Sequence, residues 1–329
     1  MSSLSVPFAS VLVAVPTFFK EDGQIDLSAL KHIVDYVLSR EAYGIGVLFE
    51  AAEDPLLSED ERRMLIDAVA DAVKDRAPFV VNVSSPATRP AVDLVRHAQT
   101  KGAAGVVVSS YRLPGLGYRA LYRHFDRIAK ATELPTYLGV RPEGAADWLT
   151  PEELATLGDH EKLAGTYVPG APPSIVKQWA KRVKSRSGTV FTACSFEFTQ
   201  RAKAGSTGSI CGLSVLGIEK AVALSKAFVA GDVTSIRRLE RQVAPAVETL
   251  GPPKTSAELS GVKKLAARIA QRPLEGGELP PITPSGLIKE GLRLQGHPVR
   301  SLVRPPYERV GPSQSERLRS IMKSAGLLS

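Results

Sequence analysis

The chain has 329 residues, 43% of them apolar, with 27 glycines and 24 prolines. These values suit one large domain or two ordinary ones with a buried core, and they exclude a disordered chain, a collagen and a disulfide scaffold. The formal net charge is +8, but residues 251–329 hold 13 Lys and Arg against 6 Asp and Glu, so the excess lies in the tail. Because the tail has one tyrosine, Tyr307, and no nucleic-acid-binding module, we expect a solvated or intersubunit surface and no nucleic-acid partner.

The beginning of the chain and its cysteines bear on where the protein works. The first charged residue is Lys20, after an apolar stretch over residues 6–19 that contains two prolines. Such a stretch lacks the basic start of a secretory signal and is too short to cross a bilayer. Two cysteines, Cys194 and Cys211, are too few for a disulfide framework or a zinc knuckle. We therefore expect a cytoplasmic protein without a membrane segment.

Short apolar runs alternate with longer amphipathic segments over residues 11–229. The apolar runs, typical of strands covered on both faces, are 11–15, 44–49, 79–83, 105–109, 135–139, 165–168, 190–193 and 208–211. Helical patterns follow them, including 91–101, 119–131, 174–184, 196–204 and 217–229. Eight strand–helix units in succession predict an α/β fold, a closed (β/α)8 TIM barrel.

Several of the expected helices start with capping residues. These are Asp26, the capping box Ser58-Glu59-Asp60-Glu61, the pair Thr150-Pro151, and a second box, Ser313-Gln314-Ser315-Glu316. After residue 230 the strand pattern stops, and helical runs cover 233–250, 258–271 and 286–294 before the last helix. We therefore expect a barrel over residues 1–230 and a C-terminal helical region, 231–329, packed on it.

In a barrel of this type, functional residues lie at the carboxyl ends of the strands. Residues 9–230 resemble the dihydrodipicolinate synthase / N-acetylneuraminate lyase family of pyruvate-dependent class I aldolases. The segments that carry the resemblance are 17–26 (TFFKEDGQID), Leu57-Ser58-Glu59-Asp60-Glu61-Arg62, Ser109-Ser110-Tyr111 and Leu121-Tyr122-Arg123-His124-Phe125. The segment 286–291, together with Val303-Arg304-Pro305-Pro306, is similar to the end of the 5-keto-4-deoxyglucarate dehydratase branch.

The resemblance implies an activity and an assembly. Family members form a Schiff base between a lysine and a small oxo acid, with no metal and no cofactor. They are homotetramers made of two tight dimers, and Tyr111 matches a tyrosine that reaches the site of the neighbouring subunit. We therefore expect a small-molecule ligand, a homo-oligomer (a dimer of dimers) and no bound cofactor.

This sequence departs from the family pattern at three chemically important positions. Where the family has its Schiff-base lysine, at the end of the sixth strand, this sequence has Tyr167, and where the family has a catalytic tyrosine, at the end of the fifth strand, it has Gly139. Tyr137 is the nearest phenol and is expected to sit lower in the barrel. The two carboxylate-binding threonines after the second strand are replaced by Glu50 and Ala51.

These replacements oppose the usual chemistry. A tyrosine cannot form an imine, and its ordinary pKa of about 10 leaves it neutral at pH 7. Glu50 places a negative charge where an anion should bind, and like charges about 4 Å apart cost roughly 4 kcal/mol at an effective dielectric of about 20. Standard pyruvate aldolase or synthase activity is therefore not expected. Two hypotheses remain: a lyase-family enzyme with altered chemistry, or a catalytically silent barrel that serves as a binding or assembly subunit.

The candidate catalytic residues are Glu50, Tyr111 and Tyr167. The expected ligand-binding residues lie at the strand ends: Thr17, Glu50, Ala51, Tyr111, Arg141, Tyr167 and Ile210. Four of them have a structural alternative: Glu50 as a solvated neighbour of a buried Glu53, Tyr167 as a space-filling side chain, Tyr111 as an interface residue, and Arg141 as an ion-pair partner of Glu50.

The remaining cysteines, lysines and histidines provide few candidates at the strand ends. Cys194 and Glu197 after the seventh strand provide a possible nucleophile and base, although buried cysteines are commonly inert. Lys177, Lys181, Lys184 and Lys203 do not fall at the carboxyl end of a strand, so none is expected to replace the Schiff-base lysine. None of the five histidines falls there either, so we expect no histidine-based metal site or catalytic triad.

Overall fold

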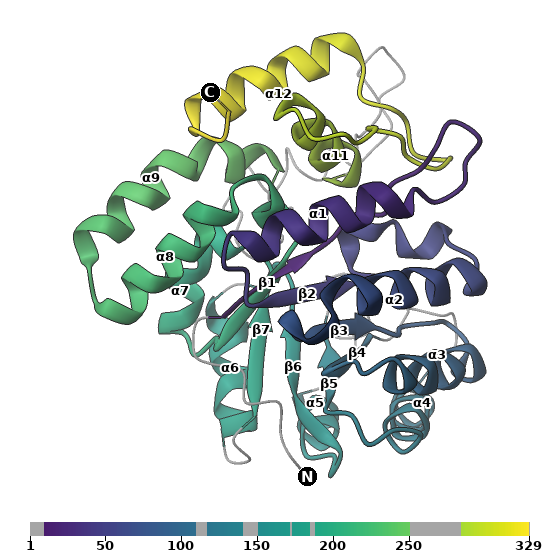
Figure 1. Cartoon of the computed structure of the whole chain (residues 1–329). Coiled ribbons are helices and arrows are strands. Elements are labelled where there is room, and N and C mark those ends of the chain that lie inside the picture. Colours follow the sequence, from purple (N-terminus) through teal and green to yellow (C-terminus); the bar gives the residue numbers. More distant parts are fainter. Residues whose placement is uncertain are drawn as a thin grey trace, which may run out of the picture.

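The computed structural model describes residues 10–109, 117–140, 151–171, 173–184, 188–250 and 284–328. Within them, parallel strands β1 to β8 form a closed barrel in sequence order, with β8 paired to β1 (Figure 1). The strands are β1 (Ser10–Ala14), β2 (Gly44–Val47), β3 (Phe79–Asn82), β4 (Gly105–Ser109), β5 (Thr136–Gly139), β6 (Leu163–Val168), β7 (Thr189–Thr192) and β8 (Gly208–Cys211). The predicted (β/α)8 barrel is confirmed.

Helices follow the strands and cover the outside of the barrel. They are α1 (Leu27–Ser39), α2 (Glu59–Val73), α3 (Thr88–Thr100), α4 (Tyr118–Ala129), α5 (Pro151–Gly158), α6 (Pro173–Lys184), α7 (Phe198–Lys203) and α8 (Ile218–Ala230). Asp26 caps α1 by accepting a hydrogen bond from the N–H of Ala29 at 3.1 Å. The capping box of Ser58 and Glu61 opens α2 as predicted.

The predicted cap of the last helix is wrong by two residues. Helix α12 (Pro312–Ser324) has Gly311 as its N-cap, and the N–H of Gly311 donates to Oε1 of Gln314 at 2.8 Å. Pro312 fits the first helical position because the N–H that proline lacks would have no partner inside the helix. The Ser313–Glu316 box therefore lies inside the first turns and not at the start.

The inside of the barrel is a separate core. Alternate residues of each strand point inward, so this core is made of side chains spaced two apart. Its buried members are Leu12, Ala14, Phe49, Val80, Val107, Tyr137, Tyr167, Phe191 and Ile210. The other strand residues face the helices in a larger core. Ser109, Gly139 and Tyr167 pair in register at the carboxyl end of this interior.

The C-terminal helices pack on the barrel at that same end. Helix α11 (Pro284–Leu294) contacts the turn Glu50–Ala52 after β2 and the turn Leu213–Leu216 after β8. Helices α9 (Val233–Leu250) and α12 contact each other and α11, as Figure 1 shows in green and yellow. The helix predicted over 258–271 lies outside the described residues.

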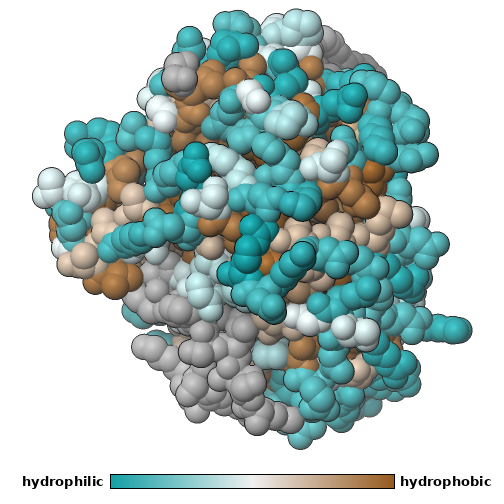
Figure 2. Space-filling model, viewed as in Figure 1, coloured by the Kyte–Doolittle hydropathy of each residue, from teal (hydrophilic) through white to brown (hydrophobic). Residues whose placement is uncertain are grey.

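The viewed surface is mainly hydrophilic, with hydrophobic residues in small groups between the polar ones (Figure 2). Among the described residues, five large apolar side chains are exposed: Leu27, Met64, Val229, Val233 and Tyr307. No described helix combines the length and the apolar character needed to cross a membrane.

Candidate functional site

The loop after β2 has an unusual backbone at the carboxyl end of the barrel. Leu48 and Glu53 adopt left-handed conformations, with φ of 63° and 56°, on either side of the short turn Glu50–Ala52. Left-handed backbone is unfavourable for a residue with a Cβ, so surrounding contacts must hold it. The amide of Asn82 donates to the carbonyl of Leu48 at 2.7 Å, and Thr17 Oγ1 donates to the carbonyl of Ala52 at 2.8 Å.

Two of the predicted site residues meet at this loop. The hydroxyl of Tyr167, from β6, donates to Oε2 of Glu50 at 2.9 Å. The Tyr167 ring is buried and packs edge-on against Phe49, with ring centroids 5.2 Å apart. Glu50 itself is exposed. The position expected to carry a lysine therefore holds a phenol that is bonded to a carboxylate.

The other predicted ligand-binding residues occupy different places. Thr17 is buried, and its hydroxyl supports the loop after β2. Ala51 is buried beside the end of β8, where a Cβ on Gly212 would lie 2.7 Å from its own. Ile210 belongs to the inner barrel core. Tyr111 and Arg141 lie outside the described residues, so the roles expected for them stay predictions.

The end of β5 lacks a phenol, as the sequence indicates. Gly139 has no room for a side chain in this arrangement, because a Cβ there would lie 1.9 Å from Oγ of Ser109. Tyr137 lies one inward-facing position lower, since it pairs with Gly165 while Gly139 pairs with Tyr167. Burial raises the pKa of Tyr137 to about 12, so this phenol is neutral at physiological pH.

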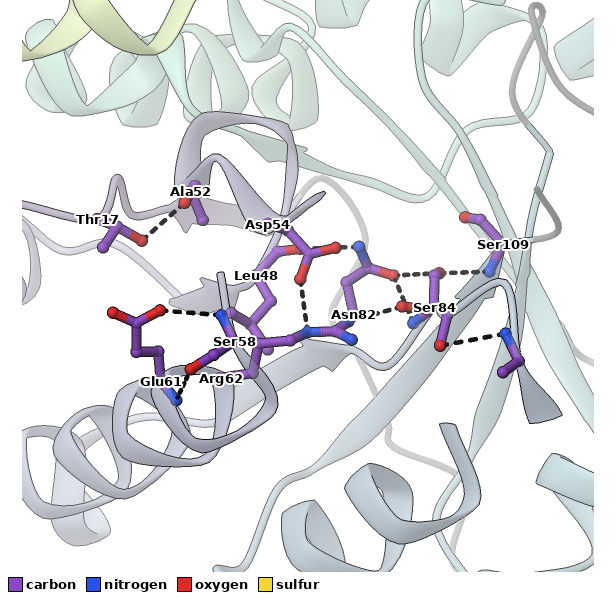
Figure 3. A network of polar contacts seen from close by, with 12 residues as sticks. Thr17, Leu48, Ala52, Asp54, Ser58, Glu61, Arg62, Asn82, Ser84 and Ser109 are labelled. Atoms are coloured by element: carbon purple, nitrogen blue, oxygen red, sulfur yellow. Dashed lines mark hydrogen bonds and ion pairs between the residues drawn. The ribbon is translucent and has the colours of Figure 1, made fainter. Parts of the chain in front are cut away.

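A buried polar network links the loop after β2 to the ends of β3 and β4 (Figure 3). Nε of Arg62 pairs with Oδ1 of Asp54 at 2.8 Å, and its guanidinium donates to the carbonyl of Ser84 at 2.6 Å. Ser84 Oγ donates to Oδ1 of Asn82 at 2.5 Å and accepts from the N–H of Ser109 at 2.7 Å. These contacts fix the backbone that carries Glu50 relative to the strands beside it.

Glu53, three residues after Glu50, is held in a second buried network. Its carboxylate accepts from Nζ of Lys289, from Ser285 Oγ at 2.7 Å and from the N–H of Arg304 at 2.9 Å. Lys289 also donates to the carbonyl of Leu302 at 2.8 Å. Burial lowers the pKa of Lys289 to about 8, although Glu53 opposes that shift. Glu53 thus anchors the C-terminal region to the mouth of the barrel.

Lys289 and Ser285, which bond to Glu53 at this end of the barrel, were not singled out by sequence reasoning, whereas Glu53 was expected to be buried. The signal available was the segment 286–291, which contains Lys289 and matches a family motif. Arg304 lies in the other matching tail segment, and its guanidinium donates to Oε2 of Glu61 at 2.6 Å. Part of the basic excess of the tail therefore pairs with acidic residues of the barrel.

The proposed pair of Cys194 and Glu197 is not assembled as a nucleophile and a base. Oε2 of Glu197 lies 2.8 Å from a guanidinium nitrogen of Arg201. A hydrogen bond with Cys211 and complete burial raise the pKa of the Cys194 thiol well above its ordinary value. In the described ranges, no three or more His, Cys, Asp or Glu residues are grouped where they could hold a metal ion.

The geometry defines a class of protein. A closed parallel barrel with polar side chains gathered at the carboxyl ends of its strands is the architecture of barrel enzymes. The model of the Dihydrodipicolinate synthetase family matches residues 7–285. The chain belongs to this family.

Known relatives agree over most of the chain. A 4-hydroxy-tetrahydrodipicolinate synthase from Acidothermus cellulolyticus is 28% identical, over 97% of this chain and 93% of the relative. A probable 2-dehydro-3-deoxy-D-pentonate aldolase from Escherichia coli is 25% identical, over 84% and 91%. A solved prophage protein of the dihydrodipicolinic acid synthase family from Escherichia coli, in complex with pyruvate, has a TM-score of 0.80 at 22% identity, covering 97% and 99% of the two chains. This last likeness concerns the fold.

Proposed function

We propose that this member of the family binds a small metabolite at the barrel mouth through Glu50 and Tyr167, and that any lyase chemistry there is proton transfer by these two groups. The observation that carries the proposal is the 2.9 Å hydrogen bond from the Tyr167 hydroxyl to Glu50. It joins the two residues at which the sequence departs most strongly from the family pattern.

The side chain at position 167 argues against imine chemistry. A phenol cannot form an imine, and Tyr167 occupies the position that the resemblance assigns to the reactive lysine. Lys289 is a buried lysine beside the loop that carries Glu50, and its lowered pKa is the kind that favours a nucleophilic amine. Its Nζ, however, is bonded to Glu53 and to the carbonyl of Leu302, which is a structural arrangement.

The pair is suited to general acid and base catalysis. A carboxylate accepts a proton, and a neutral phenol donates a hydrogen bond or a proton to an oxygen that gains charge. Because Glu50 is exposed, it can meet a ligand that enters from solvent. Its negative charge favours neutral or cationic ligands over carboxylates, and this preference supports altered chemistry over ordinary pyruvate binding.

Calorimetric titration with pyruvate tests the proposal through the charge of Glu50. Wild type is expected to bind pyruvate weakly, and Glu50→Gln is expected to bind it about fivefold more tightly, as removal of about 1 kcal/mol of screened repulsion requires. Glu133→Gln makes the same change at an exposed carboxylate before β5, at the opposite end of the barrel, and is expected to have no effect. Equal pyruvate affinity in wild type and Glu50→Gln would contradict the proposal and favour the silent barrel.

Assembly follows as a separate part of the proposal. Membership of the family supports a homo-oligomer, and the resemblance at Tyr111 favours a dimer of dimers. Light scattering of the full chain is expected to give the mass of a tetramer, and a monomer at micromolar concentration would contradict this expectation.

A further inference from the structure

Ser109 carries a buried hydroxyl at the carboxyl end of the barrel interior. Ser109 is the last residue of β4 and is 3% exposed. Within the part of the chain that the structure describes, its Oγ has no hydrogen-bond partner. Burying a hydroxyl without a hydrogen-bond partner destabilises the fold by about 1–3 kcal/mol, so we expect such a group to have a function.

The Ser109 hydroxyl points into the barrel and not toward the helices. Val107, two residues earlier, belongs to the inner core, and side chains two apart on a strand share a face. A Cβ on Gly139 would lie 1.9 Å from Ser109 Oγ, which places the hydroxyl against the inner face of β5. The N–H of Ser109 donates to Ser84 Oγ at 2.7 Å, so the backbone behind the hydroxyl is fixed.

Ser109 and Tyr167 lie on either side of Gly139, and the three residues form one layer across neighbouring strands at the inside of the barrel. Ser109 pairs with Gly139, and Gly139 pairs with Tyr167. Two strand spacings of about 4.8 Å separate Ser109 from Tyr167, and Gly139 places no side chain between them. The Tyr167 side of this layer carries Glu50, whose carboxylate accepts hydrogen bonds.

We propose that Ser109 is a ligand-binding residue whose hydroxyl, together with Glu50 and Tyr167, recognises an uncharged, polyhydroxylated metabolite. The inference rests on the proposed function and specifies its ligand class. A serine hydroxyl both donates and accepts hydrogen bonds, so it suits an alcohol group of a ligand. The Glu50 carboxylate accepts hydrogen bonds and repels a carboxylate, so it favours a ligand group that donates and is uncharged. An open-chain polyol carries no charge, and its hydroxyls provide hydrogen-bond donors to both Ser109 and Glu50.

The test is binding of D-glucitol to the full chain, with D-gluconate as its charged counterpart, by isothermal titration calorimetry. Wild type is expected to bind D-glucitol more tightly than D-gluconate. Ser109→Ala is expected to weaken D-glucitol binding about tenfold, the usual effect of losing one such hydrogen bond, and Ser109→Thr is expected to retain it.

A matched control separates ligand binding from stability. Thr166, on β6, carries another buried hydroxyl without a partner among the described residues, but it alternates with the inward-facing Tyr167 and so faces the helices. Thr166→Val is expected to leave D-glucitol binding unchanged. Thermal unfolding of each variant establishes that it is folded before binding is compared.

The possible results separate the two proposals. If D-glucitol binding is lost in Glu50→Gln and Tyr167→Phe but is unchanged in Ser109→Ala, the role of Ser109 is wrong and the proposed function stands. If binding depends on Ser109 but not on Glu50 or Tyr167, the proposed function is wrong and the Ser109 site stands. Absence of D-glucitol binding at millimolar concentration, or tighter binding of D-gluconate, would overturn the inference.

Discussion

Glu50 and Glu53 lie three residues apart in one loop and have opposite surroundings. Glu53 is 2% exposed, and its carboxylate is bonded to Lys289, Ser285 and the N–H of Arg304. Glu50 is exposed, and its carboxylate receives the hydroxyl of Tyr167. The buried carboxylate of Glu53 thus holds the C-terminal region on the barrel, while the exposed carboxylate of Glu50 remains accessible to a ligand.

The physical reason for the difference is solvation. Removing a carboxylate from water costs several kcal/mol unless a cation and hydrogen bonds replace the water, and Glu53 has both. Glu50 is exposed, so water solvates its carboxylate and no buried cation is needed beside it. Burial therefore assigns Glu53 to stability and leaves Glu50 available for chemistry.

The same substitution at the two positions should produce the largest contrast. Glu53→Gln leaves the Lys289 ammonium buried without its counter-charge, and we expect a loss of about 3–5 kcal/mol in the free energy of unfolding. Glu50→Gln should change it by less than about 0.5 kcal/mol because Glu50 is exposed. Urea denaturation followed by circular dichroism measures both. A loss for Glu50→Gln as large as that for Glu53→Gln would contradict the comparison.

A second contrast concerns acid stability. A hydrogen bond from Arg304 lowers the pKa of Glu61 to about 2, so this carboxylate stabilises the fold above its unfolded pKa of about 4.5, and the contribution is lost as the pH falls towards 2. We expect a loss of about 3 kcal/mol from this group across that interval.

Comparison with Glu61→Gln isolates this contribution from that of other carboxylates. The variant should be less stable than wild type at pH 6, and the two should converge as the pH falls to about 2. Unfolding curves at a series of pH values provide the measurement. A constant difference between them from pH 6 to pH 2 would show that the Arg304–Glu61 pair does not fasten the tail.

The smallest stability effect is expected at the candidate site. Tyr167→Phe removes the hydroxyl that bonds Glu50 but keeps the ring that packs on Phe49. We expect a change of about 1 kcal/mol or less in the free energy of unfolding, because solvent can replace the hydrogen bond at an exposed carboxylate. Thermal unfolding checks this value. A loss of several kcal/mol would indicate that Tyr167 is a structural residue like Glu53.

The sequence predicted the barrel well because short, largely apolar strand segments recur between amphipathic helical segments. The expected strands 105–109 and 208–211 coincide with β4 and β8. The start of α12 was predicted less well, because Gly311 caps this helix through its backbone N–H, which leaves no side-chain signal at the cap itself.

The site was predicted residue by residue but not as an arrangement. Glu50 and Tyr167 were identifiable because Glu50 follows β2 and Tyr167 lies near the end of β6, both at the expected end of the barrel. Their hydrogen bond was not, because it depends on the left-handed turn at Leu48. Lys289 was missed because it is 236 residues away from Glu53 in the sequence. Contacts over such separations depend on packing of the tail, which local patterns do not specify.

Reductive trapping tests the central claim most directly, which is that the barrel mouth does not carry out imine chemistry. The full chain is incubated with pyruvate and borohydride, and the intact mass is compared with that of the urea-unfolded chain treated in the same way. We predict no stoichiometric adduct beyond the labelling of the unfolded chain, because the position at which the resemblance expects the lysine is Tyr167, and Lys289 is held by Glu53. A saturable adduct of one pyruvate per chain, at Lys289 or any other lysine, would contradict this account.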